Sequence, residues 1–140
     1  MDRKASAHWE GGLKDGKGSV STESGALDAS YSFKKRFEDE QGTNPEELIG
    51  AAHASCFSMA LSMILGEKGY TAESIDTQAK VTLSQGSAGF DISKIHLEVE
   101  ASIRDADDAV FKEAAEMAKA NCPVSKVLNA EITMTAKLKG

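Results

Sequence analysis

Residues 43–66, TNPEELIGAAHASCFSMALSMILG, constrain the fold more than any other stretch of this 140-residue chain. Asn44 can cap a helix, and Pro45 suits the first helical position. Glu46 and Glu47 then place two carboxylates in the first turn, where negative charge opposes the positive end of the helix dipole. We therefore predict that a helix begins here.

The side chains that follow are apolar or small around nearly the whole circumference of this helix. Between residues 51 and 65, His53 is the only strongly polar side chain. A helix that is apolar on all sides is typical of a buried position. We therefore predict a buried central helix over residues 43–66, with the thiol of Cys56 near its middle.

Length, charge and composition predict one soluble domain over residues 1–140. The chain is long enough for a substantial core. Its net charge of −6 and pI of about 5.1 disfavour nucleic acid and anionic membranes as partners. It has no run of eighteen apolar residues and no apolar signal region at its start, so we expect a cytoplasmic protein that does not span a membrane.

The remaining patterns predict an α+β domain whose sheets pack against the central helix. Three short strands are expected within residues 4–37, the third over residues 31–37. Gly66 and Gly69 stop the helix. Two alternating segments, residues 75–83 and 90–103, form a long hairpin. Its apolar parity changes before Ile95, which predicts a bulge near residues 93–94.

A second helix is expected from a cap at Asp105 or Asp107 to about residue 120. Cys122 and Pro123 end it, because proline cannot continue a helix. A short helical turn can start at Pro123, which would place Cys122 near a helix start. Residues 131–139 alternate and predict the last strand.

The two cysteines are the main candidates for chemistry. Cys56 and Cys122 lie 66 positions apart, which is neither a CxxC motif nor a zinc-finger spacing. His53 precedes Cys56 by one helical turn, but the other histidines, His8 and His96, are scattered, so no metal site is expected. In a reducing compartment the pair is either functional or two buried free thiols, since free cysteine is often buried.

The surroundings of the thiols differ. Backbone N–H groups at a turn beginning with Pro123 could favour a thiolate at Cys122. Cys56 lies too deep in its helix for the helix dipole alone to lower its pKa, so it needs a separate cation. Arg36 is the nearest candidate along the chain, and Glu46 could hold it in place by a two-pronged ion pair.

Four segments resemble the OsmC branch of the OsmC/Ohr family of thiol peroxidases over nearly the full length. They are AHWEGGLKDGKGSVSTESG at residues 7–25, RFE at 36–38, GTNPEELIGAAHASCFSMALSMIL at 42–65 and NCPVSKVLNAEI at 121–132. The combination of the segment at residues 42–65 with the segment at residues 121–132 is specific for this family.

The resemblance implies a cysteine-based mechanism. Cys56 is then the peroxidatic cysteine, which attacks a hydroperoxide and becomes a sulfenic acid. Cys122 is the resolving cysteine, which forms a disulfide with Cys56, and an external thiol or dithiol restores both. Arg36 stabilises the Cys56 thiolate and orients the peroxide, and Glu46 pairs with Arg36. Glu47 is interpreted as a capping residue only.

The resemblance also implies a fold, a partner and a substrate. The fold is an intertwined homodimer in which sheets from both chains wrap two central helices. No flavin, haem, metal or other cofactor is implied. The expected activity is reduction of organic hydroperoxides, and more weakly of hydrogen peroxide, in oxidative or osmotic stress defence. Candidates for an apolar substrate funnel, each favoured more strongly as plain core, are Met59, Met63, Phe57, Ile49 and Phe37.

Two alternatives use the same residues. In the first, the disulfide switches a redox sensor or a binding protein; the lack of a basic patch or DNA-binding signature disfavours a DNA-binding regulator. In the second, the chain is a structural dimer with two inert buried thiols.

Overall fold

The computed structural model describes residues 1–139, and the chain divides into two compact units. The first unit comprises residues 1–48 and the second begins at Ile49, so the boundary falls inside the long helix α2 (Pro45–Glu67). Two three-stranded sheets and four helices among the described residues confirm the α+β class. The expectation of a single domain over residues 1–140 stays a prediction.

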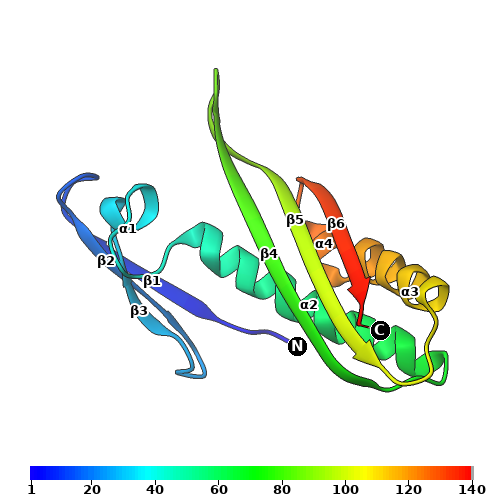
Figure 1. Cartoon of the computed structure of the whole chain (residues 1–140). Helices are drawn as coiled ribbons and strands as arrows, with labels where there is room; N and C mark the ends of the chain where they lie inside the picture. The colour runs from blue at the N-terminus through cyan, green and yellow to red at the C-terminus, as the bar shows by residue number, and fades with distance from the viewer. Residues whose placement is uncertain (140) are drawn as a thin grey trace. The chain divides into compact units, whose positions relative to one another are not determined.

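The first unit is built on an antiparallel sheet of three short strands. They are β1 (Ala5–Glu10), β2 (Lys17–Thr22) and β3 (Asp28–Tyr31), paired in the order β1-β2-β3. A short helix, α1 (Phe33–Phe37), follows β3 (Figure 1). Strand β3 ends at Tyr31, and the next residue, Ser32, caps α1.

The predicted third strand over residues 31–37 is wrong, because the strand ends at Tyr31 and α1 takes its place. The side chain of Ser32 accepts a hydrogen bond from the backbone N–H of Lys35 at 3.2 Å, which caps α1. Phe33 and Phe37 lie one helical turn apart, with ring centroids 4.9 Å apart. Their spacing of four residues is a helical spacing, and the interpretation as an alternating strand overlooked it.

Helix α2 begins and ends as the sequence predicts. The side chain of Asn44 accepts a hydrogen bond from the N–H of Glu47 at 2.8 Å. At the other end the N–H of Tyr70 donates to the carbonyl of Leu65 at 2.9 Å, and Gly69 adopts a positive φ of 88°. Glycine takes this left-handed conformation without steric cost, which is why the chain leaves the helix here.

The prediction that α2 is buried on all sides is wrong for the single chain. Phe57, Leu61 and Leu65 are fully buried, but Met59 is 75% exposed and Met63 is 61% exposed. One chain covers one face of the helix and leaves the opposite face open. The apolar pattern indicates that α2 requires burial, but the rest of this single chain packs against one side of the helix only.

Among the described residues, α2 is the one helix whose length and hydropathy would suit a membrane span. Only 33% of its most apolar 18-residue window is buried. A core helix of a soluble protein passes the same test, so this is weak evidence for a membrane. The expectations of no membrane span and of a cytoplasmic location stay predictions.

The second unit contains a long hairpin and one parallel strand. Strands β4 (Ala72–Gly86) and β5 (Gly89–Ile103) pair antiparallel, and β6 (Glu131–Leu138) runs parallel to β5. Thr82 pairs with Lys94 but Leu83 pairs with Ile92, so Ser93 has no partner in the register. This confirms the predicted bulge.

Two helices connect β5 to β6 and lie with α2 on one face of the sheet (Figure 1). Helix α3 (Asp108–Asn121) is capped by Asp107, whose side chain accepts the N–H of Val110 at 2.8 Å. Helix α4 (Pro123–Val127) follows at once. The core consists of the inward side chains of these elements: Phe57, Leu61 and Leu65 from α2, Ile95, Leu97, Val99 and Ala101 from β5, and Phe111, Ala114, Ala115 and Ala118 from α3.

Candidate active site

The fold of the second unit brings the two thiols together. Cys56 lies in the middle of α2, and Cys122 is the cap residue between α3 and α4. Both are free, and they lie close enough for each side chain to shift the pKa of the other. Cys122 is fully buried, whereas Cys56 is partly exposed. Two residues 66 positions apart in sequence therefore form one dithiol pair.

Hydrogen-bond donors surround the sulfur of Cys122. Pro123 starts α4, which leaves the N–H of Ser125 free to donate to Cys122 Sγ at 3.5 Å. Burial opposes ionisation of Cys122, but the N–H of Ser125, the Cys56 thiol, the Ser125 hydroxyl and the N–H of Val124 outweigh it and lower the pKa of Cys122. The predicted placement of Cys122 at a helix start is confirmed.

Cys56 has the opposite electrostatics. Burial raises its pKa, the N–H of Val124 lowers it, and the hydrogen bond and charge of Cys122 raise it again; the net shift is upward. No cation contributes to this shift within residues 1–139. Of the two thiols in the single chain, Cys122 thus has the lower pKa and loses its proton first. The inference that Cys56 needs a separate cation for activation agrees with this.

The first unit contains the predicted ion pair. Arg36 Nη2 donates to Glu46 Oε1 at 2.7 Å, and Arg36 Nε donates to Oε1 at 3.1 Å and to Oε2 at 3.2 Å. The side chain of Glu46 is 12% exposed and that of Arg36 is 36% exposed. Glu46 is fixed in the first turn of α2, so it holds the guanidinium of α1 in one orientation.

The structure therefore assembles the four predicted site residues as two pairs. Arg36 and Glu46 belong to the first unit, and Cys56 and Cys122 belong to the second. Both pairings agree with the sequence analysis, and the chemical roles assigned to the four residues stay predictions.

Sequence reasoning missed a hydrogen bond beside the thiols. His53 Nε2 and Ser125 Oγ lie 2.7 Å apart, and both residues are buried. Burial lowers the pKa of His53, so the imidazole is neutral at physiological pH. Two spacings of three residues could have indicated this pair, since His53 precedes Cys56 by one turn and Ser125 follows Cys122 by one turn.

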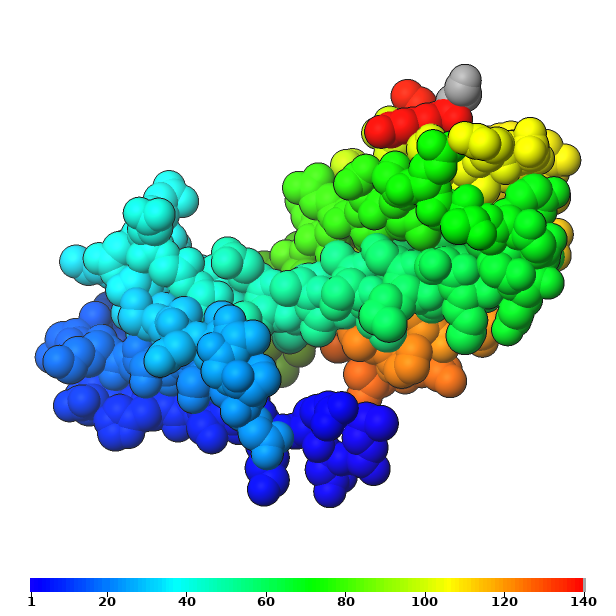
Figure 2. Space-filling model, turned by 90° about the horizontal axis from the view of Figure 1, so that it is seen from below, coloured from blue at the N-terminus to red at the C-terminus, as the bar shows by residue number. Residues whose placement is uncertain are grey.

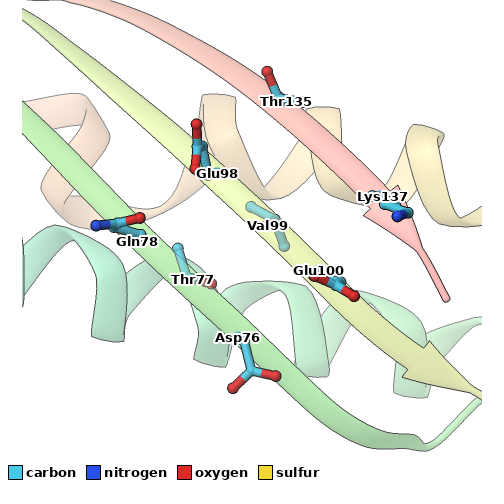
Figure 3. A pocket seen from close by; sticks show the side chains of 8 residues that line it. All are labelled: Asp76, Thr77, Gln78, Glu98, Val99, Glu100, Thr135 and Lys137. Carbon is cyan, nitrogen blue, oxygen red and sulfur yellow. The ribbon is translucent and has the colours of Figure 1, made fainter.

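Two hollows among the described residues lie away from the thiols. One, of about 510 Å³, lies on the open face of the second sheet, where Asp76, Gln78, Glu98, Glu100, Thr135 and Lys137 point away from the helices (Figure 3). It carries more carboxylates than cations and no nucleophile. A second hollow of about 230 Å³, in the first unit, is lined by Ala7, Val20, Tyr31, Thr43, Asn44, Pro45 and Leu48.

The proposed funnel residues do not form one group. Phe57 is fully buried in the core and Ile49 packs against it, whereas Met59, Met63 and Phe37 are exposed. Within residues 1–139 no three or more His, Cys, Asp or Glu side chains are grouped to hold a metal ion. The expectation that the protein needs no cofactor stays a prediction.

Replacing Cys122 with Ser should lower the pKa of Cys56, because the substitution removes a neighbouring thiolate whose charge and hydrogen bond both raise it. Alkylation of Cys56 by iodoacetamide, followed against pH, should then reach half its maximal rate at lower pH than in the wild type. Cys122→Ala serves as the matched variant without a hydroxyl. A midpoint that stays or rises in both variants would contradict the coupling between the thiols.

Comparison with known proteins identifies the family. The family of OsmC-like proteins matches residues 38–137. The chain is 58% identical over 140 residues to peroxiredoxin OsmC of Escherichia coli K12, a match that covers 99% of this chain and 98% of the relative. It resembles the crystal structure of the organic hydroperoxide resistance protein OhrB of Bacillus subtilis at 25% identity and a TM-score of 0.70, covering 97% of this chain and 98% of that one.

An OsmC-like protein of Vibrio cholerae shares the fold at 17% identity, with a TM-score of 0.78 and coverage of 97% and 99% of the two chains. Similarity at this level of identity shows the fold alone. The 58% identity to the Escherichia coli relative, over nearly the full length of both chains, shows the family as well. The thiol pair, the arginine–glutamate pair and the α+β architecture occur here in a chain that belongs to the OsmC branch of the OsmC/Ohr family.

Proposed function

We propose that this protein is a cysteine-based peroxidase that reduces organic hydroperoxides to alcohols, and hydrogen peroxide more weakly. The observation that carries the proposal is the contact between the thiols of Cys56 and Cys122. The family supports it, because the relative with 58% identity is named a peroxiredoxin and a more distant one, from Bacillus subtilis, is named an organic hydroperoxide resistance protein.

The proposed cycle begins at Cys56. Its thiolate attacks the distal oxygen of the hydroperoxide, the O–O bond breaks, and the leaving alkoxide takes a proton to become the alcohol. Cys56 is then a sulfenic acid. The Cys122 thiolate attacks the sulfenic sulfur and hydroxide leaves as water, which forms the Cys56–Cys122 disulfide. An external thiol reductant returns both sulfurs to the reduced state.

The hydrogen bonds around Cys122 suit its part in this cycle. A resolving cysteine must attack as a thiolate, and the donors from Ser125 and Val124 lower the pKa of Cys122. The two side chains already touch in the reduced protein, so the disulfide needs little movement of α2 and α4. Burial beside Cys56 also limits access of other thiols to Cys122.

Activation of Cys56 requires positive charge, which we assign to Arg36. Desolvation by burial raises the pKa of Cys56, and a guanidinium beside the sulfur would offset this cost. The hydrogen bonds to Glu46 leave one face of the Arg36 fork for the thiolate and the peroxide. In this proposal Glu46 acts through Arg36 by fixing its orientation.

We propose that two copies of the chain form a homodimer through the open face of α2. This face carries an exposed stripe at helical spacing that includes Ala52, Ser55, Met59, Met63 and Gly66. Figure 2 shows the side chains of this part of α2, in green, uncovered on the side facing the viewer. An apolar helix face of this kind is stable when another chain covers it. A second copy supplies an equivalent face, as isologous dimers do.

The proposed biological setting is defence against oxidative or osmotic stress in the cytoplasm. A redox sensor that uses the same disulfide is the competing function. The two differ in turnover, because a peroxidase consumes peroxide continuously while reductant lasts, whereas a sensor is oxidised once and stops.

One equivalent of cumene hydroperoxide should convert both thiols of the reduced protein into one Cys56–Cys122 disulfide and release cumyl alcohol. Thiol counting and peptide mass spectrometry measure the products. Cys56→Ser should leave peroxide untouched, and Cys122→Ser should stop at a sulfenic acid that dimedone traps. With excess peroxide and dithiothreitol the wild type should turn over steadily. Two intact thiols in folded wild-type protein would refute the peroxidase, and a single oxidation without turnover would favour the sensor.

Arg36→Ala should raise the pKa of Cys56 and slow peroxide reduction at neutral pH by at least about tenfold, since one preorganised charge is lost from the reacting centre. Arg36→Lys should have a Cys56 pKa and a reduction rate between those of the wild type and Arg36→Ala, because lysine keeps the charge but lacks the forked guanidinium. Lys34→Ala, on the same short helix, is the control. If Cys56 alkylation follows the same pH curve in all four proteins, Arg36 has no part in the site.

Met59→Lys should disrupt the dimer, because it places a charge in the centre of the proposed apolar interface. Sedimentation equilibrium should show a mass near the 14.8 kDa of one chain, whereas the wild type should show twice that mass. The same substitution at the exposed Met117 of α3 is the matched control. A wild type that sediments as a monomer, or a Met59→Lys protein that remains a dimer, would exclude this interface.

A further inference from the structure

We propose that His53 and Ser125 are positioning residues for the recycling step: Ser125, held by its hydrogen bond to His53, donates to the Cys122 sulfur and makes Cys122 the leaving sulfur of the Cys56–Cys122 disulfide, so that the reducing thiol attacks Cys56. The inference rests on the proposed function for its biological use. It concerns the buried pair His53 and Ser125, which the proposed peroxide step does not use.

Ser125 connects His53 to the sulfur of Cys122. Its backbone N–H donates to Cys122 Sγ at 3.5 Å, and its hydroxyl lies near enough to the same sulfur to help lower the pKa of Cys122. The hydroxyl oxygen in turn lies 2.7 Å from His53 Nε2. A continuous line of hydrogen bonds therefore runs from α2 through α4 to the sulfur of Cys122.

The direction of these hydrogen bonds follows from the environment of His53. The side chain is fully buried, and its Nδ1 has no hydrogen-bond partner among residues 1–139. A buried N–H without an acceptor is rarer in proteins than a buried lone pair without a donor. The proton of the neutral imidazole therefore belongs on Nε2, which donates to Ser125 Oγ. Because Ser125 accepts from His53, its own O–H is free to donate to Cys122.

The hydrogen-bond donors around Cys122 determine which sulfur leaves during disulfide exchange. An attacking thiolate displaces the sulfur that better accommodates negative charge, so donors on Cys122 favour its departure. Cys56 has one such donor, the N–H of Val124, and burial dominates its environment. Of the two sulfurs, Cys122 is thus the better leaving group.

Access leads to the same conclusion independently. The side chain of Cys122 is 0% exposed, while Cys56 is partly exposed. Cys122 lies at the junction of α3 and α4, so Cys56 is the sulfur of the pair that has accessible surface in the single chain. Accessibility and leaving-group stability therefore select the same sulfur for attack.

The exchange balances as follows. The reductant thiolate forms a bond to Cys56 Sγ while the S–S bond breaks, and the bonding electron pair goes to Cys122 as a thiolate. A second thiol of the reductant then attacks the reductant sulfur in this mixed disulfide and releases Cys56 as a thiolate. The dithiol loses two electrons and becomes a cyclic disulfide, and its protons pass to solvent or to the protein thiols.

The test uses disulfide-form protein prepared with diamide, so that it does not depend on peroxide activity. Brief treatment with glutathione and acid quenching should give a mixed disulfide that peptide mass spectrometry locates on Cys56. Glutathione on Cys122 in the wild type would overturn the inference. If peroxide fails to oxidise the protein but glutathione is still found on Cys56, the proposed function fails and this inference stands.

Ser125→Ala should slow reduction of the disulfide by dithiothreitol about tenfold, because it removes one donor to a charged sulfur. Ser125→Thr retains the hydroxyl and should restore the rate. Ser84→Ala, which removes a partly exposed hydroxyl on β4 that lies 2.7 Å from Ser93 Oγ and far from the thiols in sequence, is the matched control. Equal rates for Ser125→Ala and the wild type would overturn the role of Ser125.

Titration of Cys122 distinguishes an electrostatic role of His53 and Ser125 from a merely structural one. In the Cys56→Ser background, ultraviolet absorbance of the thiolate reports the ionisation of Cys122 alone. Ser125→Ala and His53→Gln should each move this titration to higher pH, and Ser125→Thr should leave it near its starting position. A titration that does not move, in variants with an unchanged unfolding midpoint, would show that the pair only packs α4 against α2.

Discussion

The structure depends on the packing of one apolar helix against one face of a small sheet. Phe57, Leu61 and Leu65 of α2 fill the space between β5 and α3, and their burial fixes the rotation of the helix about its axis. This rotation decides where every other side chain of α2 points. Cys56 borders the core on one side, and Met59 and Met63 face outward. The reactive thiol is therefore positioned by the burial of the adjacent Phe57 and of Leu61 and Leu65 further along the helix.

The two sulfurs share one low-dielectric environment, and the site depends on which of them carries the negative charge. A thiolate is costly among apolar side chains, so two thiolates in contact are not tolerated. Hydrogen bonds from α4 favour the charge on Cys122, while a guanidinium is needed to draw it to Cys56. The proposed functions of the four residues follow from this competition. The arginine–glutamate pair would decide which sulfur reacts first with peroxide, and Ser125 which sulfur leaves first when the disulfide is reduced.

Much of this arrangement could be predicted from local patterns. The cap at Asn44, the bulge at Ser93 and the cap role of Cys122 depend on residues close in sequence, so their signals are direct. Helix α1 was missed because Tyr31 and Phe33 alternate like a strand, while the decisive contact joins Phe33 to Phe37. The hydrogen bond between His53 and Ser125 joins residues 72 positions apart, and only the assembled fold brings them together. The single chain covers only one face of α2, because an apolar sequence shows that a helix needs burial but not which chain provides it.

The connection between β5 and β6 has a topological consequence. Cys122 lies in this connection, so a bond from its sulfur to Cys56 would close a covalent ring that contains the whole β4–β5 hairpin and α3. Reduced and oxidised protein would then be different polymers, one linear and one circular over half of its length. Closing a ring of this size restricts the unfolded chain by about 4 kcal/mol of entropy at room temperature. Each catalytic cycle would thus alternate the second unit between a more easily unfolded and a more resistant form, coupling the redox state of the protein to its turnover by proteases.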